Sequence, residues 1–207
     1  ENKIRTLDPE TGEFNEFLQL EDDSLPWDLK FDNEGTLWFT EFGRSFLTSV
    51  QINDVNSLTE YRIPSNISSP SYFEFDKDGN IWLVESGPGI LTKFDTYTHE
   101  FTQFILPSDG VGSETVNPIG LAIDNDGNIW YSQFRTSLIG KLNPNTNEIT
   151  KYATGTLTAG TYQIISDNAG NRWTTQFRAE RLIKISPQTN STPEFKIPTD
   201  NTFTQTL

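Results

Sequence analysis

Few side chains in the sequence are of a type and in a setting that could carry catalytic chemistry. The only histidine, His99, stands in the polar stretch 95–100, which we interpret as the turn of a hairpin. An imidazole in a solvated turn has no third group to orient it, so we assign His99 no catalytic role. The sequence contains no cysteine, which excludes a disulfide framework, a thiolate metal site and a cysteine nucleophile.

Carboxylates recur in a phrase that at first sight suggests calcium loops. The phrase Asp-x-Asp-Gly-Asn begins at Asp76 and again at Asp124. An EF-hand loop needs glycine at its sixth position and a bidentate glutamate at its twelfth, and neither spacing fits here. We therefore interpret the phrase as a tight turn, in which the first aspartate accepts hydrogen bonds from backbone amides ahead of it and the glycine adopts a positive φ.

The turn belongs to a repeat that spans the chain. Tryptophans recur at intervals of 44, 48 and 43 residues, each closing a phrase of the form Asp-x-x-Gly-x-x-Trp: residues 32–38, 76–82, 124–130 and 167–173. Short runs rich in β-branched and aromatic residues flank each turn, and a second hairpin follows it, as in 138–152. Four antiparallel strands in about 45 residues are typical of a propeller blade. A β-sandwich would not repeat one four-stranded phrase in register.

The repeat predicts an all-β fold, a β-propeller of four-stranded antiparallel blades in a single domain over residues 1–207. No segment has apolar residues at helical spacing. The predicted parts are a hairpin of an incomplete blade at 1–20, blades at 25–64, 69–107, 117–154 and 160–198, and a candidate first strand of a further blade at 200–207. These amount to about four and a half blades. We favour the interpretation that the chain is part of the ring of a larger propeller. A compact five-bladed ring is the alternative.

The charge and composition of the chain limit the classes of partner that it is expected to bind. The formal net charge is −14, and a surface of this sign repels phosphate backbones, so we expect no nucleic-acid partner. No run of about 18 apolar residues is present, so we expect no membrane insertion. Asn66 and Asn190 each begin a glycosylation sequon in a predicted loop, which favours an extracytoplasmic location. Because the sequence opens on Glu1 without an initiator methionine, we expect a processed chain or a piece of a longer chain or assembly.

The phrases 118–121, 130–133 and 138–142 resemble blades of the streptogramin B lyase (virginiamycin B lyase) family, and 38–41 resembles the end of that family's second strand. NHL-like propellers carry related phrases. The resemblance implies a lyase that opens a cyclic depsipeptide ester by elimination, with Mg²⁺, a histidine base and carboxylates at the central face of the propeller. Elimination of this kind needs a base and a cation to stabilise the developing negative charge.

The chain departs from the family pattern where the catalytic base is expected. In the family a Pro-His phrase opens the first strand of a blade. The residues at these places here are Trp27, Ser71, Ile119 and Tyr162 or Thr161. Since none is histidine, the catalytic residues of this chain are unknown, and whether it is an enzyme stays open.

The second strand of each blade ends on Glu41, Glu85, Gln133 or Gln176. The resemblance places a metal-binding carboxylate at this position, so Glu41 and Glu85 are candidate metal ligands. Hydrogen bonding between neighbouring blades is the alternative role for a Glu or Gln that recurs at one place in the repeat.

Aromatic and basic residues follow the second strand in three repeats, at 42–44, 134–135 and 177–178. They predict a binding face, which we assign to Trp27, Arg44, Tyr72, Arg135, Tyr162 and Arg178. Packing of the arginines on the phenylalanines is the alternative. The sequence thus favours an extracytoplasmic, non-catalytic binding module for a protein, peptide or glycan, without a cofactor. The alternative is a Mg²⁺-dependent lyase whose histidine-bearing blades lie outside this chain.

Overall fold

A computed structural model describes residues 2–108, 116–156 and 159–198. These residues form strands and turns, and none of them is helical. The chain divides into two compact units, Glu1–Ser71 and Tyr72–Leu207, which are described in turn. The predicted extent of a single domain over 1–207 stays a prediction, and the candidate strand at 200–207 lies outside the described residues.

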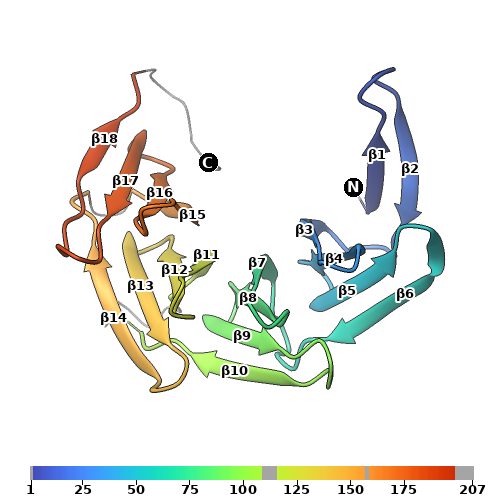
Figure 1. The fold of residues 1–207 in the computed structure, drawn as a ribbon, viewed down its shortest axis with the longest axis horizontal. Coiled ribbons are helices and arrows are strands. Elements are labelled where there is room, and N and C mark those ends of the chain that lie inside the picture. The colour runs from blue at the N-terminus through green and yellow to red at the C-terminus, as the bar shows by residue number, and fades with distance from the viewer. Residues whose placement is uncertain (1, 109–115, 157–158, 199–207) are drawn as a thin grey trace. The chain divides into compact units, whose positions relative to one another are not determined.

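The first unit holds a hairpin and a four-stranded sheet. Its strands are β1 (Lys3–Leu7), β2 (Phe14–Gln19), β3 (Pro26–Phe31), β4 (Thr36–Glu41), β5 (Phe46–Gln51) and β6 (Asp54–Arg62). Strands β1 and β2 pair antiparallel, and the sheet has the order β3-β4-β5-β6 (Figure 1). Ile4 and Leu18 of the hairpin pack with Leu37 and Phe39 of the sheet in one buried cluster.

Three further four-stranded sheets follow, the first of them starting at the end of the first unit. Their strands are β7 (Pro70–Phe75), β8 (Ile81–Glu85), β9 (Ile90–Phe94), β10 (Phe101–Ile105); β11 (Pro118–Ile123), β12 (Ile129–Gln133), β13 (Leu138–Asn143), β14 (Glu148–Ala153); β15 (Thr161–Ser166), β16 (Arg172–Gln176), β17 (Arg181–Ile185) and β18 (Glu194–Lys196). Each sheet is antiparallel and runs in chain order (Figure 1). The all-β class and the four-stranded antiparallel blade are confirmed.

The turn between the first two strands has the predicted chemistry in every blade. In the β11–β12 turn, Oδ1 of Asp124 accepts hydrogen bonds from the backbone N–H groups of Asp126 at 3.0 Å and Asn128 at 2.8 Å. Gly127 has a φ of 80°, a value that costs glycine nothing. Asp32, Asp76 and Asp167 accept the same pair of bonds in the other blades. The side-chain carboxylate thus fixes each turn from inside the loop.

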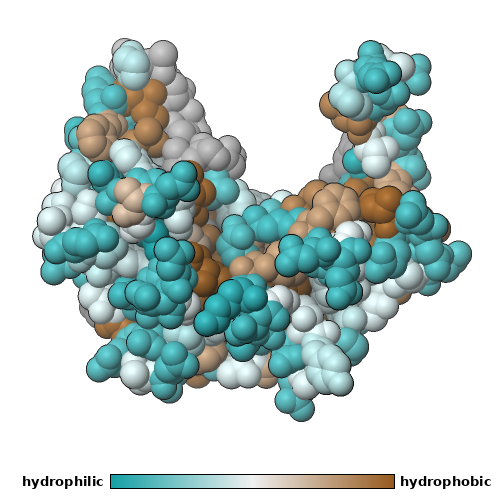
Figure 2. Space-filling model, viewed as in Figure 1, coloured by the Kyte–Doolittle hydropathy of each residue, from teal (hydrophilic) through white to brown (hydrophobic). Residues whose placement is uncertain are grey.

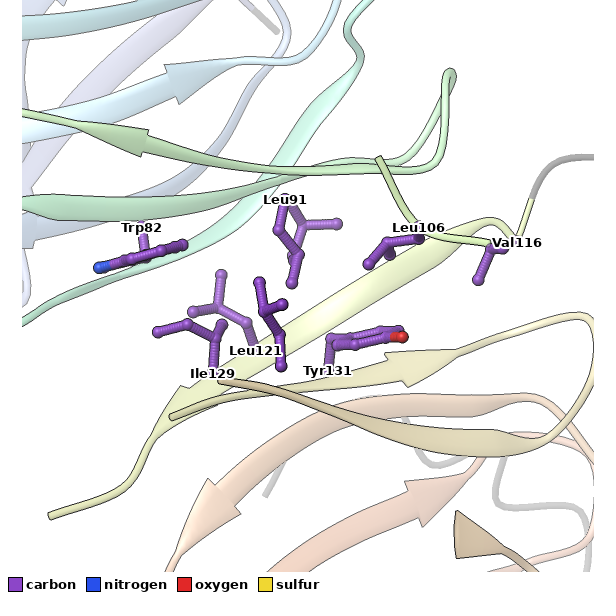
Figure 3. Packing of buried hydrophobic residues seen from close by; sticks show 9 residues of the cluster. Trp82, Leu91, Leu106, Val116, Leu121, Ile129 and Tyr131 are labelled. Carbon is purple, nitrogen blue, oxygen red and sulfur yellow. The ribbon is translucent and has the colours of Figure 1, made fainter. Parts of the chain in front are cut away.

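Successive blades of the second unit pack face to face. Figure 3 shows the cluster between the β7–β10 and β11–β14 sheets, with Trp82 and Leu91 opposite Leu121, Ile129 and Tyr131. A second cluster joins the β11–β14 and β15–β18 sheets: Ala122, Trp130, Ile139, Ile164, Ile183 and Ile185. Trp82 and Trp130 therefore pack between blades in this unit.

A hydroxyl on the second strand links each of two blades to the strand that follows. A bulge between Pro118 and Leu121 takes the Gly120 amide out of the ladder. The Ser132 hydroxyl accepts a 2.9 Å hydrogen bond from that amide and donates to the Tyr162 carbonyl in the next blade. Thr40 of the first unit bonds in the same way, accepting from Asp28 at 3.2 Å and donating to the Ser71 carbonyl at 2.8 Å. These bonds fix the starts of the first strands.

The outer hairpins face solvent. In Figure 2 the surface over β9–β10 and β13–β14 is mainly hydrophilic or neutral. Among the described residues, no helix is long and apolar enough to cross a membrane.

Candidate functional site: an aromatic cluster at the strand starts

The second unit brings four aromatic rings together from three blades. Tyr162, in β15, lies at the centre. Its ring centroid is 6.3 Å from that of Tyr72, 6.0 Å from Phe134 and 6.1 Å from Phe177. The centroids of Phe134 and Phe177 are 6.0 Å apart. Edge-to-face and stacked pairs at these distances are favourable beyond the area that they bury. We call these four residues the aromatic cluster.

Backbone hydrogen bonds hold the two phenylalanines beside the strand starts. The amide of Phe134, just after β12, donates to the Asn117 carbonyl just before β11 at 3.2 Å. The amide of Phe177, just after β16, donates to the Gly160 carbonyl just before β15 at 2.8 Å. Gly160 has a φ of 72°, and a Cβ there would lie 2.9 Å from the Phe134 ring. Only glycine therefore allows this close approach without strain.

The central ring of the aromatic cluster is buried, and the three rings around it are partly exposed. Tyr162 is 9% exposed, and burial raises the pKa of its hydroxyl. Tyr72, Phe134 and Phe177 are half-buried. The exposed Arg178 places its guanidinium carbon 5.2 Å from the centroid of the Phe134 ring, within the range of a cation–π contact. Half-exposed rings held in place by neighbours on three blades suit recognition, because little side-chain freedom remains to be lost on binding.

The predicted binding-face residues fall into separate groups. Tyr72, Tyr162 and Arg178 join the aromatic cluster, and Arg135 is exposed immediately after Phe134. Arg178 packs on Phe134, the phenylalanine of the preceding blade, and is itself exposed. An exposed binding face and packing of arginine on phenylalanine are therefore both present at Arg178.

In the first unit, Trp27 is 43% exposed and stacks on Phe42 with centroids 5.0 Å apart. Arg44 lies 4.8 Å from the centroid of Phe46 and pairs with Glu41, 3.1 Å away, and with Glu60. Arg44 is therefore tied into its own blade by two carboxylates.

The two candidate metal ligands differ in their surroundings. Glu41 is buried and both of its oxygens are engaged, one by the Thr48 hydroxyl at 2.5 Å and the other by Arg44. A guanidinium at this distance already compensates the charge, so Glu41 does not fit a divalent cation. In Glu85, Oε1 accepts from Thr92 and from Gln103, but the buried Oε2 has no hydrogen-bond partner in the protein.

The orphaned oxygen of Glu85 fits one bond to a cation, since carboxylate oxygen is the donor that Mg²⁺ prefers. The described residues nevertheless hold no group of three or more His, Cys, Asp or Glu side chains that could complete a metal site. A site at Glu85 would thus need ligands from elsewhere, and the metal assignment stays a prediction.

Gln133 and Gln176 occupy the same place in the next two blades, and both are fully buried. Oε1 of Gln133 accepts from Thr136 at 2.6 Å, within its own blade. Nε2 of Gln176 donates to the Thr154 hydroxyl at 3.0 Å, at the end of the preceding blade. The Gln176 side chain thus makes the bond between blades that the alternative interpretation expected, whereas the side-chain hydrogen bonds described for Glu41, Glu85 and Gln133 lie inside their own blades.

The remaining candidates lie away from the cluster. His99 is exposed in the β9–β10 turn, with a φ of 61°, and its ring stacks on Phe94. Asn66 is exposed between β6 and β7, and Asn190 is exposed in the β17–β18 turn. These positions are accessible to a glycosylating enzyme, but glycosylation itself stays a prediction.

The model of the virginiamycin B lyase family matches residues 1–204. The chain belongs to this family. Among curated proteins, none matches the chain.

Solved structures agree with this membership. Virginiamycin B lyase from Staphylococcus aureus, in its selenomethionine form, has a TM-score of 0.82 at 22% identity over 97% of this chain and 64% of its own. A catalytically inactive histidine-to-alanine variant of that enzyme, with quinupristin, gives 0.83 at 23% identity over 96% and 64%. A nidogen/laminin complex gives 0.59 at 14% identity over 95% and 90%. The predicted β-propeller is therefore confirmed, and this virginiamycin B lyase family member spans less than two thirds of the two lyase chains.

In this member of the virginiamycin B lyase family, two tyrosines of the aromatic cluster lie at or beside the places where the sequence resemblance expects the histidine bases. Thr161 pairs with Gln176 as Pro118 pairs with Gln133, so Tyr162 takes the place of Ile119. Tyr72 directly follows Ser71, another of these places. Sequence reasoning assigned both tyrosines and Arg178 to the binding face, and it used the Phe-Arg pairs as the signal for that face without assigning Phe134 and Phe177 to it. The signal for the full cluster was the Phe-Arg pair at the same repeat position in two successive blades, opposite a tyrosine at a strand start.

Proposed function

We propose that this chain is a non-catalytic, extracytoplasmic binding module that holds a peptide segment of a partner protein on its aromatic cluster. The observation that carries the proposal is the contact of Tyr162 with Tyr72, Phe134 and Phe177, capped by the Arg178 guanidinium. Aromatic residues and arginine dominate the energetics of protein recognition sites. A glycan, which also stacks on aromatic rings, is the competing ligand.

The absence of a base supports binding over catalysis. The sequence holds one histidine, which lies in the exposed β9–β10 turn. The four places where the resemblance expects histidine carry side chains with no group that titrates near neutral pH. An elimination reaction at the cluster would lack its proton acceptor.

The nidogen/laminin complex supports the proposal at the level of the fold, since there a propeller-like structure is found with a protein partner. The likeness rests on 14% identity, so it supports no particular interface.

Selection from a displayed peptide library tests the proposal. Peptides enriched on the wild-type chain should be lost on the double variant Phe134→Ala/Phe177→Ala. The matched control is Tyr97→Ala, because Tyr97 is 92% exposed in the β9–β10 turn away from the cluster. If selected peptides bind the double variant and the wild type equally, or if only glycans on an array are retained, binding of a peptide at the cluster is wrong.

Family membership favours one second candidate, a Mg²⁺-dependent lyase acting with blades outside this chain. We would incubate the chain with quinupristin, the compound named in the S. aureus structure, and Mg²⁺. Ring opening by elimination leaves the mass unchanged, so the product is followed by chromatographic retention and fragment masses. We expect no conversion while intact S. aureus enzyme converts the compound in parallel. Conversion by the chain, abolished by Glu85→Gln, would establish the lyase instead.

The extracytoplasmic location is tested at the sequons. Secretion of the chain through a eukaryotic glycosylating host should add a mass that Asn66→Gln and Asn190→Gln each reduce. Both side chains are exposed, so replacing them should leave the fold intact. An unmodified secreted protein would remove this support for the location.

A further inference from the structure

A surface groove lies in the second unit at the opposite end of the strands from the aromatic cluster. It has a volume of about 680 Å³ and is bounded by the ends of β7 and β11 and by the turns that follow them. Half-buried apolar side chains form part of its lining, namely Phe75, Phe104 and Ile123. We call it the turn groove.

The rim of the turn groove is acidic. It includes Asp76 and Asp78 from one turn and Asp124 and Asp126 from the next, against two lysines, Lys77 and Lys93. The aspartates thus exceed the lysines by two charges. Asp78 and Asp126 are exposed, and only their backbone amides take part in the turn bonds.

The interface between the β11–β14 and β15–β18 sheets shows that an arginine can occupy the place beside the turn aspartate and the tryptophan. Arg172 opens β16 and is 3% exposed between the β11–β14 and β15–β18 sheets. Its Nη2 lies 3.9 Å from Oδ2 of Asp124, and its guanidinium carbon lies 5.3 Å from the centroid of the Trp130 ring. An aspartate and a tryptophan of one blade therefore receive a guanidinium from the neighbouring blade.

The turn groove repeats this arrangement without the arginine. Asp76 and Trp82 hold the places of Asp124 and Trp130, and both line the groove. Ile129, at the place of Arg172, is fully buried against Trp82 in the cluster of Figure 3 and carries no charge to reach Asp76. Lys93 comes only within 4.0 Å of Asp76, whereas the Trp130 ring has Lys141 of its own blade and Arg172 of the next blade over it.

We propose that the turn groove binds an arginine side chain of a basic peptide segment from a partner protein, with the guanidinium beside the Asp76 carboxylate and over the Trp82 ring. The planar guanidinium both pairs with carboxylates and packs against aromatic faces, which the neighbouring interface demonstrates inside this chain. The exposed Asp78 and Asp126 then attract further basic residues of the segment, and Phe104 and Ile123 contact its apolar atoms.

Isothermal titration with capped peptides of one length tests the proposal. The series carries arginine, lysine or citrulline at the central position, because citrulline keeps the shape of arginine but has no charge. We expect the arginine peptide to bind about tenfold more tightly than the citrulline peptide, equivalent to ~1.4 kcal/mol, and to weaken as salt is added. Equal affinity for arginine and citrulline peptides, or tighter binding of citrulline, overturns the proposal.

Two variants locate the site. Asp78→Asn/Asp126→Asn should weaken the arginine peptide severalfold, while Glu34→Gln, at the same turn position of the first unit, should not. Ile129→Arg places the arginine of the neighbouring interface into this one and should block the groove from inside. If Ile129→Arg fails to fold, the aspartate pair decides: unchanged affinity there places binding elsewhere. Phe134→Ala/Phe177→Ala should leave this affinity unchanged, which separates the groove from the aromatic cluster.

Discussion

The indole Nε1 of Trp130 donates a 2.9 Å hydrogen bond to Oδ2 of Asp124, six residues earlier. The other oxygen of Asp124 accepts the backbone bonds of the turn, so one carboxylate connects the turn to the buried ring that packs against the next blade. Trp38, Trp82 and Trp173 donate in the same way to Asp32, Asp76 and Asp167, at 2.9, 3.2 and 2.9 Å. The repeated phrase is therefore one structural device that joins a turn to a packing face.

Replacing Trp130 with phenylalanine should destabilise the protein by about 2–4 kcal/mol. The change removes a hydrogen bond to a charged group, usually about 1.5–3 kcal/mol, and leaves a cavity at a fully buried ring. Urea unfolding measures the loss. A double-mutant cycle with Asp124→Ala separates the two contributions, and additive effects of the two substitutions would show that the bond contributes nothing.

Stability should fall in acid because of Asp124 and Asp167. Burial by itself would raise the pKa of Asp124, but hydrogen bonds from Trp130 and Asn128 and the charge of Arg172 outweigh it and hold that pKa below 3.8. The hydrogen bonds of Trp173 and Asn171 lower the pKa of Asp167 as well. The unfolded chain therefore binds protons first as the pH falls, so this stability is complete above about pH 5 and is lost progressively as the pH falls through the lowered pKa values of the folded state.

The measurement is the urea midpoint between about pH 2 and pH 6. Asp124→Asn should flatten the acid limb, because asparagine does not titrate, while Asp22→Asn serves as an exposed control. An acid limb that is equally steep in Asp124→Asn and the wild type would assign the transition to other carboxylates.

Removing the Ser132 hydroxyl should cost about 1–3 kcal/mol of unfolding free energy. Ser132→Ala leaves the amide of Gly120 and the carbonyl of Tyr162 without this buried partner. Ser132→Thr should restore most of the loss, because threonine makes the equivalent bonds at position 40 in the first unit. Equal stability of Ser132→Ala and the wild type would mean that water replaces the hydroxyl without loss.

The periodic features of the fold were readable in the sequence, and the features that depend on one pair of blades were not. The Asp-x-x-Gly-x-x-Trp phrase predicted the turns and the repeated four-stranded sheets because identical local chemistry repeats four times. The sequence around Arg172 does not indicate that its guanidinium lies beside Asp124. That contact depends on which faces of successive sheets meet.

In the candidate site, too, single positions could be predicted from the sequence, whereas contacts between blades could not. Tyr72 and Tyr162 were identified from their places at the strand starts, but their meeting with Phe134 and Phe177 requires three blades to be packed. Glu41 and Glu85 look equivalent in sequence. Only the structure shows that Arg44 engages Glu41 while one oxygen of Glu85 is left without a partner.

The pairing of Tyr131 with Gly140 gives the sharpest test of packing in a blade. These residues face each other across β12 and β13, and a Cβ on Gly140 would lie 2.0 Å from Cζ of Tyr131. The matching pair in the β7–β10 sheet is Leu83 with Thr92, where a smaller ring-free side chain leaves room for a larger partner. Gly140→Thr alone should therefore destabilise the protein by more than ~3 kcal/mol, because the buried ring cannot move aside without displacing the cluster of Figure 3.

The double variant Tyr131→Leu/Gly140→Thr transplants the neighbouring pair and should recover at least about half of that loss, since the two residues are in direct contact and their effects are not additive. Urea unfolding of the two single variants and the double variant completes the cycle. Tyr131→Leu alone should cost about 1–3 kcal/mol through the cavity that it leaves. A double variant whose loss equals the sum of the single losses would show that the ring and the glycine are not matched to each other.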